Sequence, residues 1–278
     1  MVGSMTHKIA FIGYGDIAER TCKALALAGY NNMFGICRHP QNKTTYPGVT
    51  LVAGDVTNAS DLEAFIDAEV STIVLTLTPN RGREDAYFDG YVLPCRLLQH
   101  HLHAKGLSPR IIYVSSSGVY GQRDGEWITE ATLAEPADQA SKLLLQAEQI
   151  IASASEHTSI LRCSGIYGPN RTRLAELLIS GDAVITPAWT NRIHADDVAG
   201  FIAYLIQHPQ QQQPLFLVSD DEPLLQEEAY RRLAERLGVD LGGLTRVQEI
   251  GRRGSKRIDN RLLKASGYQL LHPTYQPR

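Results

Sequence analysis

Several features that would assign this chain to a membrane, secreted or metal-binding class are missing from its sequence. No apolar run approaches the roughly 18–20 residues that cross a bilayer, and no secretory signal pattern opens the chain. The cysteines are few and scattered, without a C-x-x-C pair, which argues against a disulfide framework and a zinc site: Cys22, Cys37, Cys95 and Cys163. We therefore expect a protein of the reducing cytoplasm, without a bound metal.

An excess of positive charge is missing as well. Lys and Arg number 27 against 30 Asp and Glu, which gives a net charge of −3 and a pI of about 6.3. This balance offers no electrostatic reason to expect nucleic acid or an anionic membrane as a partner. The 278 residues are 43% hydrophobic, enough to bury a core in one large domain or two unequal lobes. We take Met5 as the natural start and leave residues 1–4 out of the fold prediction.

What the sequence does contain is an alternation of two periodicities. Short apolar or β-branched runs alternate with helical patterns, which predicts an α/β fold built on a doubly wound parallel sheet. The expected strands cover residues 8–12, 33–37, 50–53, 72–77, 110–115, 159–163 and 215–218. The expected helices cover residues 16–28, 61–68, 84–104 (which we expect Pro94 to kink), 138–154, 174–179, 196–207, 224–237 and 258–265.

A glycine-rich turn joins the first strand to the first helix. Gly13, Gly15 and Ala18 match G-x-G-x-x-A in the required context, after an apolar strand and at the start of a helix. Without side chains at the glycines, a pyrophosphate can approach the backbone N–H groups at the helix N-terminus. The alternative is an ordinary glycine-bearing turn. We expect cofactor contacts from Gly13, Tyr14, Gly15, Asp16 and Ile17.

The end of the second strand bears on the choice between NAD and NADP. NAD-binding proteins usually place a carboxylate there, against the ribose 2′-hydroxyl. This chain has Arg38 instead, which can pair with a 2′-phosphate and favours NADP, with NAD still open. A solvated arginine at a strand end is the simpler alternative. Asp55, after the third strand, can accept a hydrogen bond from the adenine amino group or can merely form a turn.

Three further segments carry a resemblance to a known superfamily. Residues 114–121 (VSSSGVYG), 161–171 (LRCSGIYGPNR) and 191–199 (NRIHADDVA) follow the glycine loop in the same order as in that superfamily. Together they resemble the extended and atypical short-chain dehydrogenases/reductases, to which the NAD-dependent epimerases and dehydratases belong. Residues 256–275 resemble the closing segment of the atypical members.

The resemblance implies a Rossmann domain at residues 5–165 plus 193–219 and a smaller C-terminal substrate lobe at residues 166–192 plus 220–278. It implies a small-molecule substrate and suggests a homodimer. Ser116 would bind the substrate oxygen, Lys142 would hold the nicotinamide ribose, and Asp197 would cap the following helix. Further cofactor contacts are expected from Val56, Leu77, Thr78, Cys163 and Ile166, and substrate contacts from Ser117, Tyr120, Tyr167, Arg171, Arg192 and His194.

The chain departs from the superfamily at the proton donor. In the Y-x-x-x-K pattern, the position four residues before Lys142 is occupied by Asp138. Asp138 is a candidate acid–base group, but an i, i+4 ion pair with Lys142 is the simpler interpretation. His100, His101 and His103 are expected at the surface, on different helix faces, which argues against a shared metal.

Two functions therefore remain open. The first is an NADP-dependent oxidoreductase or epimerase/dehydratase that acts on a sugar-like or other small carbonyl or hydroxyl compound. The second is an NADP-binding redox sensor or regulatory protein without turnover. Ser116, Lys142 and His194 favour the first, and the missing tyrosine favours the second.

Overall fold

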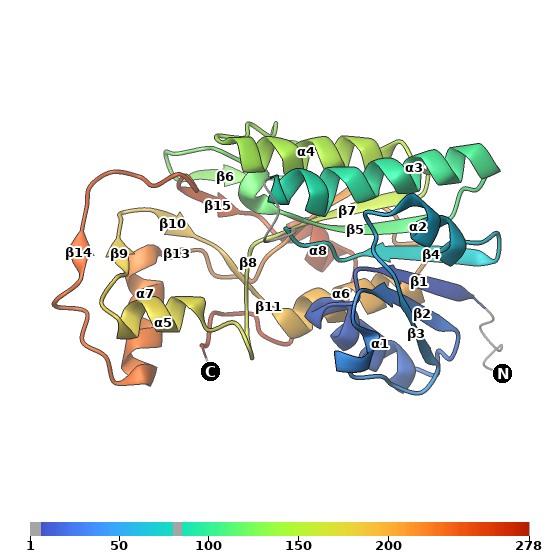
Figure 1. Cartoon of the computed structure of the whole chain (residues 1–278). Coiled ribbons are helices and arrows are strands. Elements are labelled where there is room, and N and C mark those ends of the chain that lie inside the picture. The colour runs from blue at the N-terminus through green and yellow to red at the C-terminus, as the bar shows by residue number, and fades with distance from the viewer. Residues whose placement is uncertain (1–6, 80–84, 278) are drawn as a thin grey trace. The chain divides into compact units, whose positions relative to one another are not determined.

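A seven-stranded parallel sheet forms the centre of the protein, which is described here by a computed structural model for residues 7–79 and 85–277 (Figure 1). The strand order is β12-β7-β5-β4-β1-β2-β3. Strands β1 Lys8–Ile12, β2 Met33–Cys37, β3 Val49–Ala53 and β4 Val70–Leu75 fill one side of the sheet, and β5 Arg110–Ser116, β7 Thr158–Cys163 and β12 Leu215–Val218 continue it. The predicted doubly wound α/β fold is confirmed.

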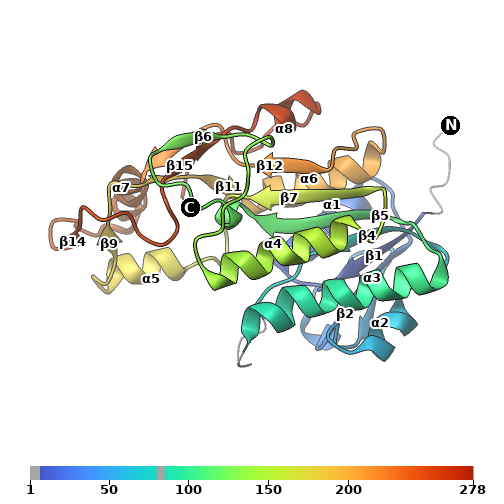
Figure 2. The same ribbon diagram turned by 90° about the horizontal axis from the view of Figure 1, so that it is seen from above.

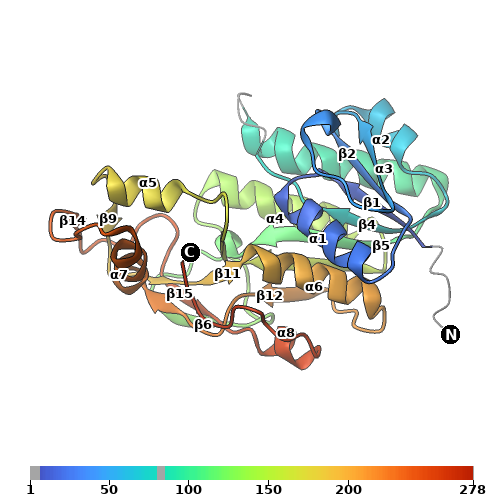
Figure 3. The ribbon, with the colours of Figure 1, turned by 90° about the horizontal axis from the view of Figure 1, so that it is seen from below.

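Helices cover both faces of this sheet. Figures 1 and 2 show α2, α3 and α4 over one face, and Figure 3 shows α1 and α6 over the other. Strands β1 and β4 are buried almost throughout, which explains their nearly continuous apolar sequences. The helices in question are α1 Asp16–Leu27, α2 Ala59–Phe65, α3 Leu93–Lys105, α4 Gln139–Ala152 and α6 Ala195–Gln207.

The strand order fixes where a ligand can bind. From β1 the chain proceeds outward to β2 and β3, and it then returns to place β4 on the other side of β1. The loops that leave the carboxyl ends of β1 and β4 therefore diverge, which opens a crevice at the sheet edge. The glycine-rich turn directly follows β1 and lies at this switch point.

Two compact units divide the chain. The first comprises the described residues up to Ser115 with Lys142–Leu161 and Ala199–Leu215, and the second comprises Ser116–Ser141, Arg162–Val198 and the described residues from Phe216 onward. The second unit contains helices α5 Arg173–Ile179, α7 Gln226–Leu237 and α8 Arg261–Ala265 and four pairs of short strands. These pairs are β6 Glu126–Ile128 with β15 Lys256–Ile258, β8 Gly165–Tyr167 with β11 Arg192–His194, β10 Trp189–Thr190 with β13 Leu224–Leu225, and β9 Val184–Ile185 with β14 Thr245–Arg246.

The structure corrects the expected helix at residues 84–104. Its first residue lies outside the described residues, and Phe88–Val92 form a π-helical segment before α3 begins at Leu93. Pro94 is the second residue of α3 and lies directly after the π-helical segment, and the expected kink there stays a prediction.

Two other helices start later than predicted. Leu224 and Leu225 pair as β13 before α7, and β15 precedes α8, because an apolar run of a few residues does not distinguish a strand from a helical turn. His101 was expected at the surface, but it is buried, and its Nε2 lies 2.8 Å from the carbonyl oxygen of Ile66. Among the described residues, no helix is long and apolar enough to cross a membrane.

Candidate functional site

The turn between β1 and α1 has the geometry that a pyrophosphate requires. Gly13 has a φ of 84°, and a Cβ there would lie 3.0 Å from the carbonyl oxygen of Thr76. At Gly15, by contrast, a Cβ would meet nothing within 4 Å. Within residues 7–79 and 85–277, no side chain caps the N-terminus of α1. Gly13 thus makes the tight turn, while Gly15 leaves the helix N–H groups open to a ligand.

The side chain of Tyr14 supports this turn from within the core. Its ring is only 1% exposed and packs over Gly35 of β2, where a Cβ would lie 2.4 Å from the ring. Burial raises the pKa of the Tyr14 phenol well above its usual range. Tyr14 therefore anchors the glycine turn to the second strand and offers a ligand its backbone.

A cavity of about 260 Å³ opens beside the glycine turn. It contains eight of the residues predicted to bind the cofactor: Gly13, Tyr14, Gly15, Arg38, Asp55, Val56, Leu77 and Thr78. Asp16 and Ile17 lie in the first turn of α1, where Asp16 accepts a 2.8 Å hydrogen bond from Arg20. The other lining residues were not predicted from the sequence: Ile36, Cys37, His39, Lys43, Gly54, Thr57, Thr76, Pro79, Asp89 and Gly90.

The rim of the cavity at the end of β2 is basic. Arg38, His39 and Lys43 all line it, although Lys43 is five residues beyond Arg38. A 3-10 turn at Pro40–Asn42 folds the chain back and explains this convergence. At the end of β3, Asp55 Oδ1 accepts hydrogen bonds from the backbone N–H (3.0 Å) and hydroxyl (2.8 Å) of Thr57, as a turn-forming aspartate does. Its role toward adenine stays a prediction.

The predicted catalytic positions have varied surroundings. The hydroxyl of Ser116 accepts a 3.0 Å hydrogen bond from the backbone N–H of Gly118, and its side chain is half-buried. Lys142 is exposed, on the solvent side of α4. On the buried side of that helix, Glu148 is 2% exposed and accepts a 2.5 Å hydrogen bond from the hydroxyl of Ser115. This pair, which was not predicted from the sequence, ties α4 to the end of β5.

Asp138 occupies the position of the superfamily tyrosine and lies directly before α4, to which its side chain is hydrogen-bonded. Its Oδ1 accepts a 2.8 Å hydrogen bond from the backbone N–H of Ser141. This bond lowers the pKa of the Asp138 carboxyl below its ordinary value, because it favours the ionised form. The observed geometry is that of an N-cap, and an ionised carboxylate has no proton to donate near neutral pH.

The substrate positions in the second unit are largely packed against other side chains. Tyr120 is fully buried, and its phenol oxygen accepts a 2.6 Å hydrogen bond from Arg162. The ring of Tyr167 contacts those of His194 and Tyr275 edge to face, with centroids 5.0 and 4.8 Å apart. Burial raises the pKa of Tyr167 to about 12. These contacts are those of packing residues.

The remaining predicted positions differ in exposure. Ser117 begins a 3-10 turn, and Ile166 is half-buried on β8. Cys163 is 2% exposed at the end of β7, and burial raises its pKa to about 12. Arg171 is exposed, whereas the guanidinium of Arg192 lies 5.5 Å from the ring centroid of Tyr275. None of these positions is shown to contact a substrate, and their roles stay predictions.

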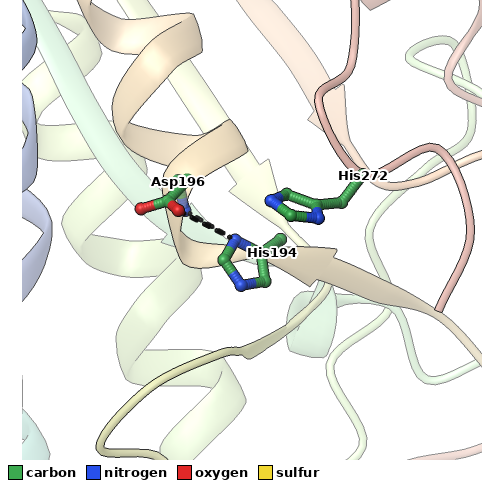
Figure 4. Close-up of side chains that lie close together, drawn as sticks. All are labelled: His194, Asp196 and His272. Carbon is green, nitrogen blue, oxygen red and sulfur yellow. Dashed lines mark hydrogen bonds and ion pairs between the residues drawn. The ribbon is translucent and has the colours of Figure 1, made fainter. Parts of the chain in front are cut away.

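One cluster has the composition of a metal site. Figure 4 shows His194, Asp196 and His272 close together, with one potential ligand atom of each within 4.8 Å of the others. Nδ1 of His194, however, accepts a 3.1 Å hydrogen bond from the backbone N–H of Asp196. The ring centroids of the two imidazoles lie 3.8 Å apart with their planes at 37°, so the rings face each other. The arrangement fits ring stacking better than coordination.

Asp197 corrects another expectation. We predicted a helix cap, but α6 begins at Ala195, and the Asp197 carboxylate is fully buried. It accepts hydrogen bonds from the backbone N–H groups of Leu271 (2.6 Å) and His272 (3.0 Å) and from the Tyr268 hydroxyl (3.2 Å). Asp197 therefore fastens the C-terminal segment to the start of α6.

Comparisons with known proteins agree with this geometry. The sequence profile of the NAD(P)H-binding family matches residues 13–209. Protein YeeZ of Escherichia coli K12 is 25% identical, over 96% of each chain. A protein from Methylobacillus flagellatus, provisionally assigned as an NAD-dependent epimerase/dehydratase, is 33% identical over 97% of this chain and 95% of its own, with a TM-score of 0.79.

A more distant structure shows the shared fold alone. DesIV, a dTDP-glucose 4,6-dehydratase from Streptomyces venezuelae, was solved with NAD bound. It is 18% identical over 95% of this chain and 92% of its own, with a TM-score of 0.78.

Proposed function

This chain belongs to the NAD(P)H-binding family within the extended and atypical short-chain dehydrogenase/reductase superfamily, and we propose that it binds NADP(H) in preference to NAD(H) and uses it on a small substrate. The expected substrate is a sugar-like or other small compound with a hydroxyl or carbonyl group. The cofactor would accept or donate a hydride at that carbon.

One observation carries the preference for NADP. Arg38 lines the cavity at the end of β2, where a carboxylate would serve the ribose 2′-hydroxyl of NAD. A guanidinium there matches a 2′-phosphate in charge and in its paired donors. Gly13, Gly15 and the start of α1 would hold the pyrophosphate, and Asp55 and Val56, also in the cavity lining, would lie beside the adenosine.

The proton needed for turnover has no donor among the predicted catalytic residues. Asp138 is an ionised cap, so the donor has to be another group or a water molecule. This observation, together with the exposure of Lys142, supports the second candidate function, an NADP-binding sensor or regulatory protein without turnover. The buried Ser115–Glu148 pair keeps the end of β5 ordered and is compatible with either function.

Titration of the purified protein with NADPH and NADH tests the cofactor preference. We expect NADPH to bind at least about tenfold more tightly and Arg38→Ala to remove most of that difference, because a charge-assisted hydrogen bond is lost. Arg96→Ala, which changes an exposed arginine on α3, is the matched control and should leave the difference intact. Equal affinities in the unmodified protein would refute the preference for NADP.

Turnover separates the two candidate functions. The protein with bound NADP⁺ should be incubated with a panel of sugars, sugar nucleotides and alcohols while absorbance at the NADPH band is followed. Reduction of the bound NADP⁺ by any compound of the panel supports the oxidoreductase. Because an epimerase or dehydratase returns the hydride within one cycle, the products also need analysis by mass spectrometry. No conversion across the panel, with cofactor binding intact, supports the sensor.

A further inference from the structure

We propose that residues 274–277 act as a displaceable latch over a ligand site in the second unit, with the ring of Tyr275 in the place of the ligand. Two residues that the superfamily resemblance assigns to the substrate, Tyr167 and Arg192, lie at this site. The inference rests on the proposed function for the class of ligand, a small compound with hydroxyl groups, and adds a control over its entry. We call residues 274–277 the latch and residues 268–273 the stem.

The stem is firmly held to the rest of the second unit. The buried Asp197 carboxylate accepts three hydrogen bonds from it, and the carbonyl oxygen of Pro273 accepts a fourth, of 2.8 Å, from the backbone N–H of Asp221. Hydrogen bonds to a carboxylate are stronger than those between neutral groups. The stem therefore stays in place when the latch moves.

Longer hydrogen bonds hold the latch. The hydroxyl of Tyr167 donates to the Thr274 carbonyl oxygen over 3.3 Å, and the guanidinium of Arg232 donates to the Tyr275 carbonyl oxygen over 3.2 Å. Arg232, and to a smaller extent the N–H of Tyr275, lowers the pKa of the Glu222 carboxyl. Two bonds of 2.7 Å join Arg232 to Glu222, so each keeps its charged partner when the latch leaves.

The ring of Tyr275 closes the site. It is 3% exposed and is the only buried side chain among residues 269–277. Its centroid lies 4.8 Å from that of Tyr167 and 5.5 Å from the guanidinium of Arg192, contacts that the ring of a ligand can reproduce. Its apolar neighbours form a small cluster apart from the core that contains β1 and β4: Leu224, Ala229 and Tyr167. The main core therefore does not depend on this ring.

A buried acceptor beside the site lacks a donor in the closed state. Asp220 is 1% exposed, and its Oδ2 has no hydrogen-bond partner among the described residues. Burial, and to a smaller extent the Asp220 carboxyl, raises the pKa of Tyr167, which places the two groups near each other. An unpaired acceptor in the interior is unfavourable. A hydroxyl group of a ligand in the place of the latch would supply the missing donor.

Digestion with carboxypeptidase Y, followed by mass spectrometry of the full chain, tests whether Tyr275 holds the latch. We expect the Tyr275→Ala variant to be digested as far as Pro273 at least about tenfold faster than the unmodified protein, because the latch is then mostly open. Leu271→Ala, at a stem residue whose side chain is 67% exposed, is the matched control and should be digested like the unmodified protein. Equal rates for Tyr275→Ala and the unmodified protein would show that the ring does not hold the latch.

A second measurement needs no variant and uses p-cresol, the tyrosine side chain without its backbone, as the probe. We expect p-cresol to speed digestion of the unmodified protein about three- to tenfold, because it competes with the Tyr275 ring for the same contacts. It should leave the digestion of Tyr275→Ala unchanged, which also shows that the carboxypeptidase itself is not affected. If p-cresol leaves the digestion of the unmodified protein unchanged, Tyr275 is a fixed packing residue and the inference is wrong.

Turnover distinguishes this inference from the proposed function. With any compound of the panel that is converted, Tyr275→Ala should raise kcat/KM about three- to tenfold, because the closed latch no longer competes. If p-cresol opens the latch but no compound is converted and NADPH is not preferred, the proposed function fails and the latch stands. If a compound is converted while p-cresol has no effect and Tyr275→Ala does not raise kcat/KM, the latch is wrong and the proposed function stands.

Discussion

Individual side chains in this protein have roles that depend on which partner reaches them. Asp55, Asp138, Asp197 and Asp220 are all aspartates near the ends of strands or helices, and each has a different environment. Asp138 accepts from a helix N–H group and is ionised, whereas Asp197 and Asp220 are buried and their pKa values are raised. Burial disfavours the charged carboxylate, and hydrogen bonds from N–H groups favour it, so the balance differs at each site.

Asp220 gives a prediction about pH at the residue scale. Burial raises its pKa from 3.8 to about 8, and its Oδ2 has no hydrogen-bond partner among the described residues. Because the folded state binds the proton more tightly, the stabilisation is complete below about pH 4 and is lost as the pH rises toward about 8. We expect Asp220→Asn to remove this pH dependence. The difference in unfolding free energy between the unmodified protein and the variant should then change by a few kcal/mol from about pH 4 to about pH 8.

The measurement for Asp220 is urea unfolding of both proteins at several pH values between 4 and 8, the window that the raised pKa defines. Comparison with the Asn variant cancels the contribution of the other titrating groups. A difference that stays constant with pH would show that the carboxyl group is ionised throughout in the folded protein.

The elements of the fold are positioned by contacts at their ends. The glycine turn starts α1, the Ser115–Glu148 hydrogen bond ties α4 to β5, and Asp138 caps the start of α4. The 3-10 turn after β2 similarly determines where Lys43 lies. In each case a few residues at a boundary decide what an entire helix or loop presents to the cavity.

The cap at Asp138 gives a prediction at this scale. Asp138→Ala should lower the unfolding free energy by about 1 kcal/mol, because the N–H of Ser141 loses its acceptor. Asp138→Asn keeps an acceptor oxygen and should lower the unfolding free energy by only a few tenths of about 1 kcal/mol. Urea unfolding at pH 7 measures both. If the proposed oxidoreductase is active, neither variant should lower kcat more than a few-fold; a loss in the Asn variant beyond about 100-fold would establish Asp138 as an acid–base group.

At the scale of the whole molecule, contacts between distant segments complete the second unit. The hydrogen bonds of Asp197 reach the C-terminal segment, whose bonded residues are 71 to 75 positions further along the chain. His272 of that segment stacks on His194, and Tyr275 packs on Tyr167. The segment thus covers two residues that the superfamily resemblance assigns to the substrate.

Removal of this anchor should loosen the C-terminal segment. In Asp197→Ala three donors lose their acceptor, so we expect an unfolding free energy lower by about 3 kcal/mol and faster cleavage C-terminal to Lys264 in limited proteolysis with trypsin. Asp196→Ala, at the neighbouring residue whose side chain is 42% exposed, is the matched control and should resist trypsin as the unmodified protein does. Equal cleavage of both variants would show that Asp197 does not hold the segment.

The sequence by itself determined the fold class and the position of the glycine turn, because these follow from local periodicity and from turns that only glycine can make. Its motifs also carried the resemblance to the superfamily. It also identified Arg38 and seven other residues of the cavity lining. It could not show that His39 and Lys43 join them, because a chain reversal sets that contact. Tertiary structure likewise decided that Asp138 is a cap, that His101 is buried and that Asp197 binds the distant C-terminal segment. Burial and long-range hydrogen bonds arise only when separate segments pack together, and a linear pattern does not specify them.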